Sequence, residues 1–327
     1  MKKLLLTALL GCLLKNALAQ LTGNQSPASN PTTADSAVLQ TDQFNKQTQN
    51  GRKWLAGGLA IAVLGGSLYL LTKSNDYVYE KKFKTVNDGG AWRQMDKSEH
   101  AYLSYTTTRL LHGLGNWAGF SPQQSVILAS TGSLAYLTTK EYLDGHFAIP
   151  GTGWSWMDMG ANLLGTTLFA SQQLVWQEQK IQFKFSALPK TYEPELNARA
   201  NILFGSSKPE RVLKDYNAQT YWLSFNLKAF SQSQNLPPWL NLAVGYGANN
   251  LFGPQENIGY ANGKVAFDRT DLKRYRQWYI SPDIDLTKIK TNSRLVKTLF
   301  FALNAVKVPL PTLEFSDQKV KGHWLHF

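Results

Sequence analysis

The spacing of apolar residues changes near residue 178, and this change constrains the fold more than any other feature of the chain. Before it, apolar residues recur over three segments that are each long enough for a helix. These segments are 97–117, 123–144 and 157–177. After it, apolar residues alternate with polar ones, as in Tyr221, Leu223 and Phe225, which is the period of a β-strand. The sequence therefore predicts an α+β fold, with a helical half followed by a β-rich half.

The three helical segments carry ionisable residues among their apolar ones. Pro122 precedes the second segment, at a position where its missing N–H costs nothing, and the glycines and Pro150 of 145–155 separate the second segment from the third. Arg109, Glu141 and Asp158 make each segment a weak transmembrane candidate by itself. Together the segments predict a small bundle with a polar inner face, partly or wholly within a bilayer.

A fourth helix is predicted from Trp54 to Thr72. This stretch has no charged residue, lies between Arg52-Lys53 and Lys73, and is just long enough to cross a hydrocarbon core. A buried hairpin of a soluble domain is the alternative. The sequence thus predicts a membrane-associated helical domain of about four helices over residues 52–178.

The first residues are typical of an exported protein. Lys2-Lys3, an apolar run and Ala17-Leu18-Ala19 predict a signal peptide over residues 1–19. The alternative is a lipobox that leaves Cys12, the only cysteine, as a lipidated N-terminus. Residues 20–51 are rich in Gln, Asn, Ser and Thr, and they predict a disordered leader because they cannot bury enough apolar surface to offset their ordering entropy.

The β-rich half, residues 179–327, is predicted to be an antiparallel region of about six strands with one helix, near 291–306. Pro282 interrupts one strand pattern and implies a bulge or a sheet edge. Gly245-x-Gly247 indicates a bend or close packing. Six strands are too few for a single-chain membrane barrel, which takes at least eight. A sheet on the helical half or at a membrane surface is therefore expected.

Composition points to a membrane rather than to nucleic acid. The formal net charge is +12, and the chain has ten tryptophans and fourteen tyrosines. A basic, aromatic-rich exported protein suits an anionic lipid surface, and its expected partners are a membrane lipid or an envelope protein. The sequence has no P-loop, dinucleotide fingerprint, G-x-S-x-G or H-E-x-x-H motif, and no cofactor is predicted.

Ionisable residues gather at matching ends of the three helical segments. Residues three or four apart share a helix face, so Asp96 with His100, Glu141 with Asp144, and Asp158 with Asn162 form polar patches. In an antiparallel bundle these patches converge. A histidine with two or three carboxylates can act as a general acid or base, or can bind a divalent cation. The ordinary alternative is a helix cap with surface ion pairs.

The segments DKSEHAYLSY, TTKEYLDGH and GTGWSWMDMGANLLGT resemble the VanZ-like membrane proteins and, more closely, the YfiM-like family of envelope lipoproteins. The resemblance covers about residues 90–177 and implies a membrane-linked helical domain, but no settled activity. The positions that match the family pattern are Asp96, Lys97, His100, Lys140, Glu141, Asp144, Trp154, Ser155, Asp158, Asn162 and Gly165.

Two functions are predicted for an exported protein of a cell-envelope membrane. In the first, the bundle binds a lipid or an envelope partner through its polar site, with contacts from Lys97, Lys140, Asp144, Trp154, Ser155 and Asn162. In the second, the protein is an enzyme acting on a lipid-linked substrate, with His100 as acid or base beside Asp96, Glu141 and Asp158. A helix at 54–72 favours the inner membrane, and aromatic strands ending in Phe327 favour the outer one.

Overall fold

The computed structural model describes the backbone of residues 34–73, 82–146, 153–231, 233 and 235–327, and the side chains of this set from Thr48 onward. The predicted signal peptide lies outside these residues. Helix α2 runs from Ala34 to Thr72, so helical structure reaches well into the segment predicted to be a disordered leader. That part of the leader contains Ala, Gln, Leu and Lys, which favour helix, and no proline after Pro31. A segment with little apolar surface cannot form a hydrophobic core of its own, but it can extend a helix that begins in the apolar segment next to it.

Within α2, residues Thr48–Thr72 form the one described helix that is long and apolar enough to cross a membrane. Several of its large apolar side chains are exposed, including Trp54, Ile61 and Tyr69. It contacts α3 and α4 of the bundle, and the buried Ser67 hydroxyl donates to that of Tyr136 on α4 at 2.9 Å. The exposed apolar surface of α2 distinguishes it from the core helix of a soluble domain.

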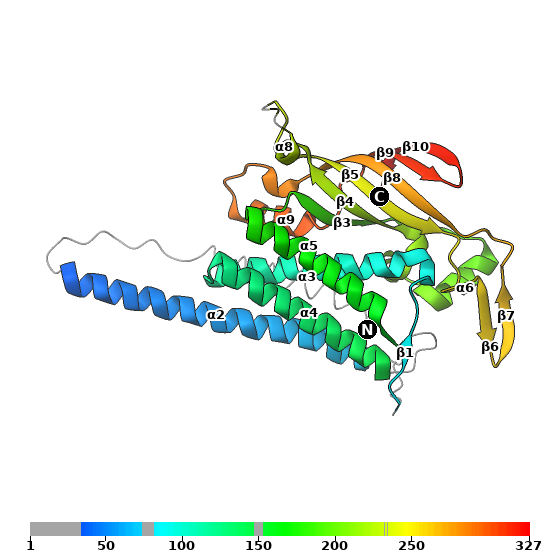
Figure 1. The fold of residues 1–327 in the computed structure, drawn as a ribbon, viewed down its shortest axis with the longest axis horizontal. Coiled ribbons are helices and arrows are strands. Elements are labelled where there is room, and N and C mark those ends of the chain that lie inside the picture. The colour runs from blue at the N-terminus through cyan, green and yellow to red at the C-terminus, as the bar shows by residue number, and fades with distance from the viewer. Residues whose placement is uncertain (1–33, 74–81, 147–152, 232, 234) are drawn as a thin grey trace.

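Helices α3 (Met95–Ala118), α4 (Pro122–His146) and α5 (Trp156–Trp176) confirm the three predicted helical segments to within a few residues. α3 lies between the other helices and contacts α2, α4 and α5 (Figure 1). It follows a short 3-10 helix, Ala91–Gln94, and ends at the left-handed Gly119. Pro122 is the first residue of α4, as predicted.

The interface of α3 with its neighbours is built from small polar residues. The Thr108 hydroxyl donates to the Ser104 carbonyl at 2.7 Å, and the Ser133 hydroxyl of α4 donates to the same carbonyl at 3.2 Å. On α5, Gly165 lies directly against Ala101 and Ser104. Small side chains allow the backbones to approach closely, and they give the bundle a polar interior.

The main sheet has six antiparallel strands in the order β10-β9-β8-β5-β4-β3, which confirms the predicted strand number. The strands are β3 (Ile181–Ala187), β4 (Gln219–Asn226), β5 (Leu240–Asn249), β8 (Tyr275–Ile284), β9 (Leu310–Ser316) and β10 (Lys319–His326). Two small sheets accompany it, formed by β1 (Thr85–Val86) with β2 (Trp154–Ser155) and by the hairpin of β6 (Ile258–Ala261) and β7 (Lys264–Asp268). The pairing of β8 with β9 ends at Ile280, so Pro282 lies on a local edge, as expected.

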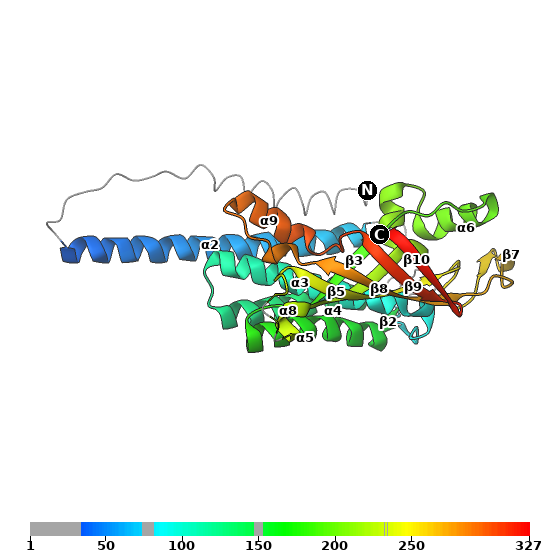
Figure 2. The same cartoon turned by 90° about the horizontal axis from the view of Figure 1, so that it is seen from above.

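The sheet and the bundle share a core at the middle of the molecule. The ring of Tyr102 on α3 packs against Phe183, Phe185 and Tyr221, with centroid separations of 5.6–6.0 Å. Met95 at the start of α3 is fully buried in the same cluster. Gly245 in β5 faces the Trp222 ring so closely that a Cβ would overlap it, which confirms the close packing predicted there. Figure 2 shows the sheet between α9 on one side and α4 and α5 on the other.

The helix count was predicted too low. The described residues contain eight α-helices, and the C-terminal half holds four of them where one was expected. They are α6 (Pro194–Phe204), α7 (Lys208–Lys214), α8 (Leu227–Phe230) and α9 (Arg294–Leu303), the last of which lies within the predicted helix. α6 is a short helix, and it is held by Ala200 and Phe204, which pack against Phe252. Such short helices depend on tertiary contacts, which residue periodicity does not reveal.

Gly165→Ala is predicted to destabilise the fold. The added methyl would overlap the Ala101 carbonyl and force α3 and α5 apart, which costs roughly 1–3 kcal/mol for overpacking of this kind. Chemical denaturation of the detergent-solubilised protein measures the change. Gly160→Ala is the matched control, because it lies on the same helix with nothing within 4 Å of the new methyl. Equal stability of the two variants would contradict the proposed close approach.

Candidate functional site

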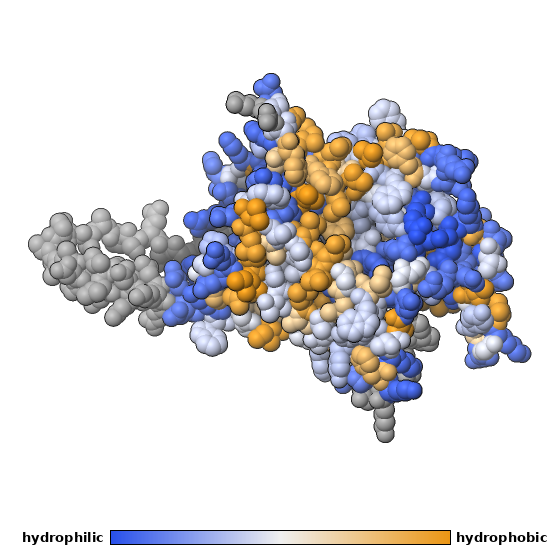
Figure 3. All heavy atoms as spheres, viewed as in Figure 1, coloured by the Kyte–Doolittle hydropathy of each residue, from blue (hydrophilic) through white to orange (hydrophobic). Residues whose placement is uncertain are grey.

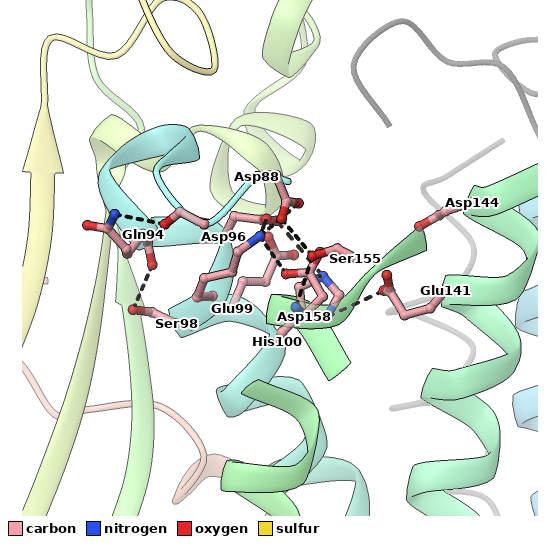
Figure 4. Close-up of polar contacts among 12 residues, drawn as sticks. Asp88, Gln94, Asp96, Ser98, Glu99, His100, Glu141, Asp144, Ser155 and Asp158 are labelled. Carbon is pink, nitrogen blue, oxygen red and sulfur yellow. Dashed lines mark hydrogen bonds and ion pairs between the residues drawn. The ribbon is translucent and has the colours of Figure 1, made fainter. Parts of the chain in front are cut away.

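The ends of three helices bring the predicted polar residues together. α3 contributes Asp96, Lys97 and His100 from its first turns, α4 contributes Glu141 near its end, and α5 contributes Asp158 and Asn162 near its start. α4 and α5 are joined by a short connection, so the end of one lies beside the start of the other. Figure 4 shows Asp96, His100, Glu141 and Asp158 pointing toward one another.

Lys97 lies among three carboxylates. Its ammonium nitrogen is 2.8 Å from Asp88 Oδ2, 2.7 Å from Asp96 Oδ2 and 2.7 Å from Asp158 Oδ1. Its side chain is 12% exposed. Burial alone would lower the pKa of this amine, but the three acids raise it, so Lys97 is a permanent cation at the centre of the cluster.

His100 lies beside Lys97 and is 5% exposed. Its Nδ1 is 3.1 Å from Asn162 Oδ1 and 3.6 Å from Glu141 Oε1. On the other side of the ring, Nε2 is 3.9 Å from Asp96 Oδ1 and 3.8 Å from Asp158 Oδ1. Burial, together with the neighbouring Lys140, lowers the pKa of His100 to about 4, so the imidazole is neutral at neutral pH. A proton on Nδ1 that is donated to Asn162 leaves the Nε2 lone pair directed at the two carboxylates.

The acids of the cluster have pKa values that differ with their surroundings. Burial and the adjacent Asp96 raise the pKa of Asp158 to about 8, and burial raises that of Glu141. Burial by itself would raise the pKa of Asp96, but the charges of His100 and Lys97 outweigh this effect, so that the pKa of Asp96 is lowered. The site therefore holds ionised and protonated carboxyl groups side by side, which is common where ionisable groups are arranged for binding or chemistry.

Other predicted site residues lie at its edge. Lys140 pairs with Asp144 at 2.8 Å and reaches Glu141 at 3.4 Å, which places this pair next to the cluster. Ser155 is the N-cap of α5, where its hydroxyl accepts from the Asp158 N–H and donates to Asp88 Oδ1 at 2.6 Å. The Trp154 ring packs with aromatic neighbours outside the cluster rather than with the ionic groups.

Sequence reasoning missed three residues that complete the cluster. Asp88 reaches Lys97 because the parallel pairing of β1 with β2 brings its loop beside Ser155. Tyr216, from the β-rich half, has its hydroxyl 2.8 Å from Glu99 Oε2 and 3.2 Å from Asp96 Oδ1. Burial, followed by Asp96, raises the pKa of Glu99 to about 7. Nothing in the sequence near Glu99 indicates this burial, which comes from its contact with Tyr216, 117 residues away.

A family described as a predicted periplasmic lipoprotein (DUF2279) has a model that matches residues 84–173, which include the whole helical part of the site. The match supports the prediction that the protein is exported and associated with the cell envelope, and that this segment belongs with envelope lipoproteins. It does not distinguish the inner membrane from the outer one. No curated protein and no solved structure matches the chain. The resemblance to VanZ-like proteins stays a prediction.

Lys97→Met is predicted to destabilise the protein strongly, because it leaves Asp88, Asp96 and Asp158 without their shared cation. Removal of one partner from a buried ion pair costs about 3–5 kcal/mol. The free energy of unfolding measures the loss. The double variant Lys97→Met/Asp96→Asn is expected to recover part of it, since the unpaired charge of Asp96, whose pKa is lowered in the cluster, is then removed. If the single variant were as stable as the parent, the carboxylates would not depend on Lys97.

Proposed function

We propose that this envelope protein binds a divalent transition-metal ion between Asp96, His100 and Asp158. One ligand atom from each of these residues lies within 4.8 Å of the other two, and this observation carries the proposal. Ligand atoms that surround a metal at about 2.0–2.2 Å lie roughly 3–4 Å apart, so a small inward movement of the side chains would complete the geometry. A nitrogen with two carboxylate oxygens suits Zn²⁺ or Mn²⁺ better than Mg²⁺ or Ca²⁺.

The orientation of His100 supports a metal ligand. Its neutral ring directs Nε2 toward the carboxylates, and its Nδ1 is held by the Asn162 side-chain oxygen, a hydrogen bond that fixes the orientation of the ring as in metal-bound histidines. Among the described residues, two buried atoms here have no hydrogen-bond partner of good geometry, Asp158 Oδ1 and Asn162 Nδ2. Asp158 Oδ1 nevertheless lies 2.7 Å from the Lys97 ammonium, so a bound ion would share this oxygen with Lys97.

The balance of charge also favours a cation. The carboxyl groups in and beside the site outnumber the ammonium groups that pair with them, which are Lys97 and Lys140. The acids are Asp88, Asp96, Glu99, Glu141, Asp144 and Asp158. Without an ion, burial raises the pKa values of Glu99, Glu141 and Asp158, whereas a bound divalent ion would favour their ionised forms.

The degree of closure distinguishes an ion from a larger ligand. Glu141 is 1% exposed, and Asp158 and His100 are each 5% exposed. These groups are accessible to an ion or a proton, whereas a lipid headgroup could touch only the more open groups at the edge, of which Lys140 has the most exposed side chain, at 25%. Lipid or partner binding by the envelope protein is therefore proposed to occur beside the ion, on the side of Lys140.

A second candidate is an enzyme acting on a lipid-linked envelope substrate. The observation that favours it is the number of protein ligands. Three ligands leave a coordination position for water or substrate, as in catalytic rather than structural zinc sites. Mass spectrometry of lipid extracts tests it: cells with Asp158→Asn at a normal protein level should accumulate a lipid-linked species absent from the parent, and unchanged lipids would contradict catalysis.

Metal binding is tested on the full chain in detergent after treatment with a chelator. Zn²⁺ or Mn²⁺ at about 100 times its dissociation constant should stabilise the parent by about 2.7 kcal/mol, seen as a rise in melting temperature. His100→Ala and Asp158→Asn should each lose this rise, because each lacks one ligand.

Asp144→Asn is the matched control. It lies in the neighbouring Lys140 pair but provides none of the three ligand atoms, so its response to metal should equal that of the parent. Titration calorimetry should give one ion per chain. Absence of saturable binding, or equal binding by the His100 and Asp158 variants, would overturn the metal site.

A further inference from the structure

The two faces of the main sheet have the reverse of the usual polarity. In β5, Leu242 and Val244 are exposed, whereas the alternate residues Asn241 and Ala243 are buried. In β8, Trp278 and Ile280 are 51% and 42% exposed, while their neighbours on the opposite face are buried. A sheet in a water-soluble domain normally buries its apolar face and exposes its polar one.

The exposed apolar residues are aligned across the strands. The register places Leu223 opposite Val244, Val244 opposite Ile280, and Ile280 opposite Leu313. A neighbouring row joins Tyr246, Trp278 and Phe315. These rows make one apolar face across four strands, which we call the outer face of the sheet. Its residues are Leu223, Leu242, Val244, Tyr246, Trp278, Ile280, Leu313 and Phe315.

The opposite, inner face is polar and buried. Lys184 and Asp283 form an ion pair at 2.8 Å with no exposure of either side chain. The Ser224 hydroxyl donates to the same Asp283 at 2.6 Å, and Gln277 donates to Glu314 at 2.8 Å. These groups use one another as partners, as buried polar groups must.

The sheet curls around this polar interior. His326 of the last strand lies 3.2 Å from the Thr220 hydroxyl of β4, although three strands separate β10 from β4 in the sheet. The free edge of β3 is partly paired by the chain after α9, where the Phe185 N–H donates to the Ala305 carbonyl. The inner face is therefore concave and the outer face convex.

The outer face continues onto the exposed side of α5. Leu163, Leu164, Leu174 and Val175 are each more than half exposed. Figure 3 shows hydrophobic residues as a band down the middle of this side of the molecule, between more hydrophilic regions to its left and right. Water-soluble monomers rarely expose an apolar band of this extent.

From this arrangement we infer that the outer face of the sheet, with the exposed side of α5, lies against the acyl chains of an envelope membrane. In sheets that face lipid, apolar side chains point outward and alternate with polar side chains that point inward. The same chain carries the apolar α2 segment Thr48–Thr72, whose length fits a bilayer. The sheet contact is independent of the metal site.

Lipid fits this surface better than a second copy of the chain does. Two convex faces would touch over a small area, whereas fluid acyl chains conform to any curvature. The band lies between hydrophilic regions on both sides, as expected where a hydrocarbon layer lies between two polar zones. A second copy is an outcome that the experiment distinguishes.

The test places an environment-sensitive fluorophore on single introduced cysteines. Val244→Cys and Ile280→Cys report the outer face, and Glu195→Cys on α6, an exposed polar position, is the control. The parent chain, which has only Cys12, gives the background labelling. Each full-length protein is reconstituted in vesicles of phosphatidylethanolamine and phosphatidylglycerol, with or without nitroxide-labelled acyl chains.

At positions 244 and 280 we expect blue-shifted emission and a several-fold loss of intensity with the nitroxide lipids, and neither effect at position 195. Emission as in water at all three positions, with quenching by aqueous iodide, would overturn the inference. Blue-shifted emission that resists the nitroxide lipids and disappears when the protein-to-lipid ratio is reduced would also overturn it, because a second copy would then cover the face.

Discussion

Burial of charge within the bundle is the constraint on which the rest of the structure depends. Lys97 can stay buried only because three carboxylates lie within 2.8 Å, and those carboxylates can stay buried only because Lys97 is there. This mutual requirement fixes the start of α3 against the start of α5 and against the loop of Asp88. It also explains why Gly165 must be small, because the two helices have to approach closely for the charges to meet.

The site also connects the two halves of the chain. Tyr216 precedes β4, and its hydroxyl contacts both Asp96 and Glu99 on α3. Tyr102, one turn beyond Glu99, packs on Phe183 and Phe185 of β3. The helix that carries His100 on one face therefore carries the sheet on another, and the polar cluster and the sheet cannot move independently.

Much of this arrangement was predictable from sequence, because it depends on residues that are close to one another in the chain. Helix periodicity, with Pro122 and the glycines of 145–155 as breaks, located the helices, and residues four apart, such as Asp96 with His100, correctly predicted which side chains share a face. Asp88 and Tyr216 were not predictable, because the first depends on a two-residue strand pairing and the second on packing between segments more than a hundred residues apart. Periodicity also missed α6 and α7, which are too short to show it.

The orientation of the sheet shows a further limit of pattern reasoning. Alternation in β5 and β8 correctly predicted strands, but alternation is unchanged when the inner and outer faces are exchanged. The usual assumption that apolar residues point inward is therefore not contained in the pattern. Buried pairs such as Lys184 with Asp283 determine which face of the sheet points inward, because each charge can be desolvated only when the other compensates it. Once these residues line the interior, the Leu, Val and Ile residues between them in sequence must face outward. The exposure of these apolar side chains costs the least free energy when they contact lipid acyl chains instead of water.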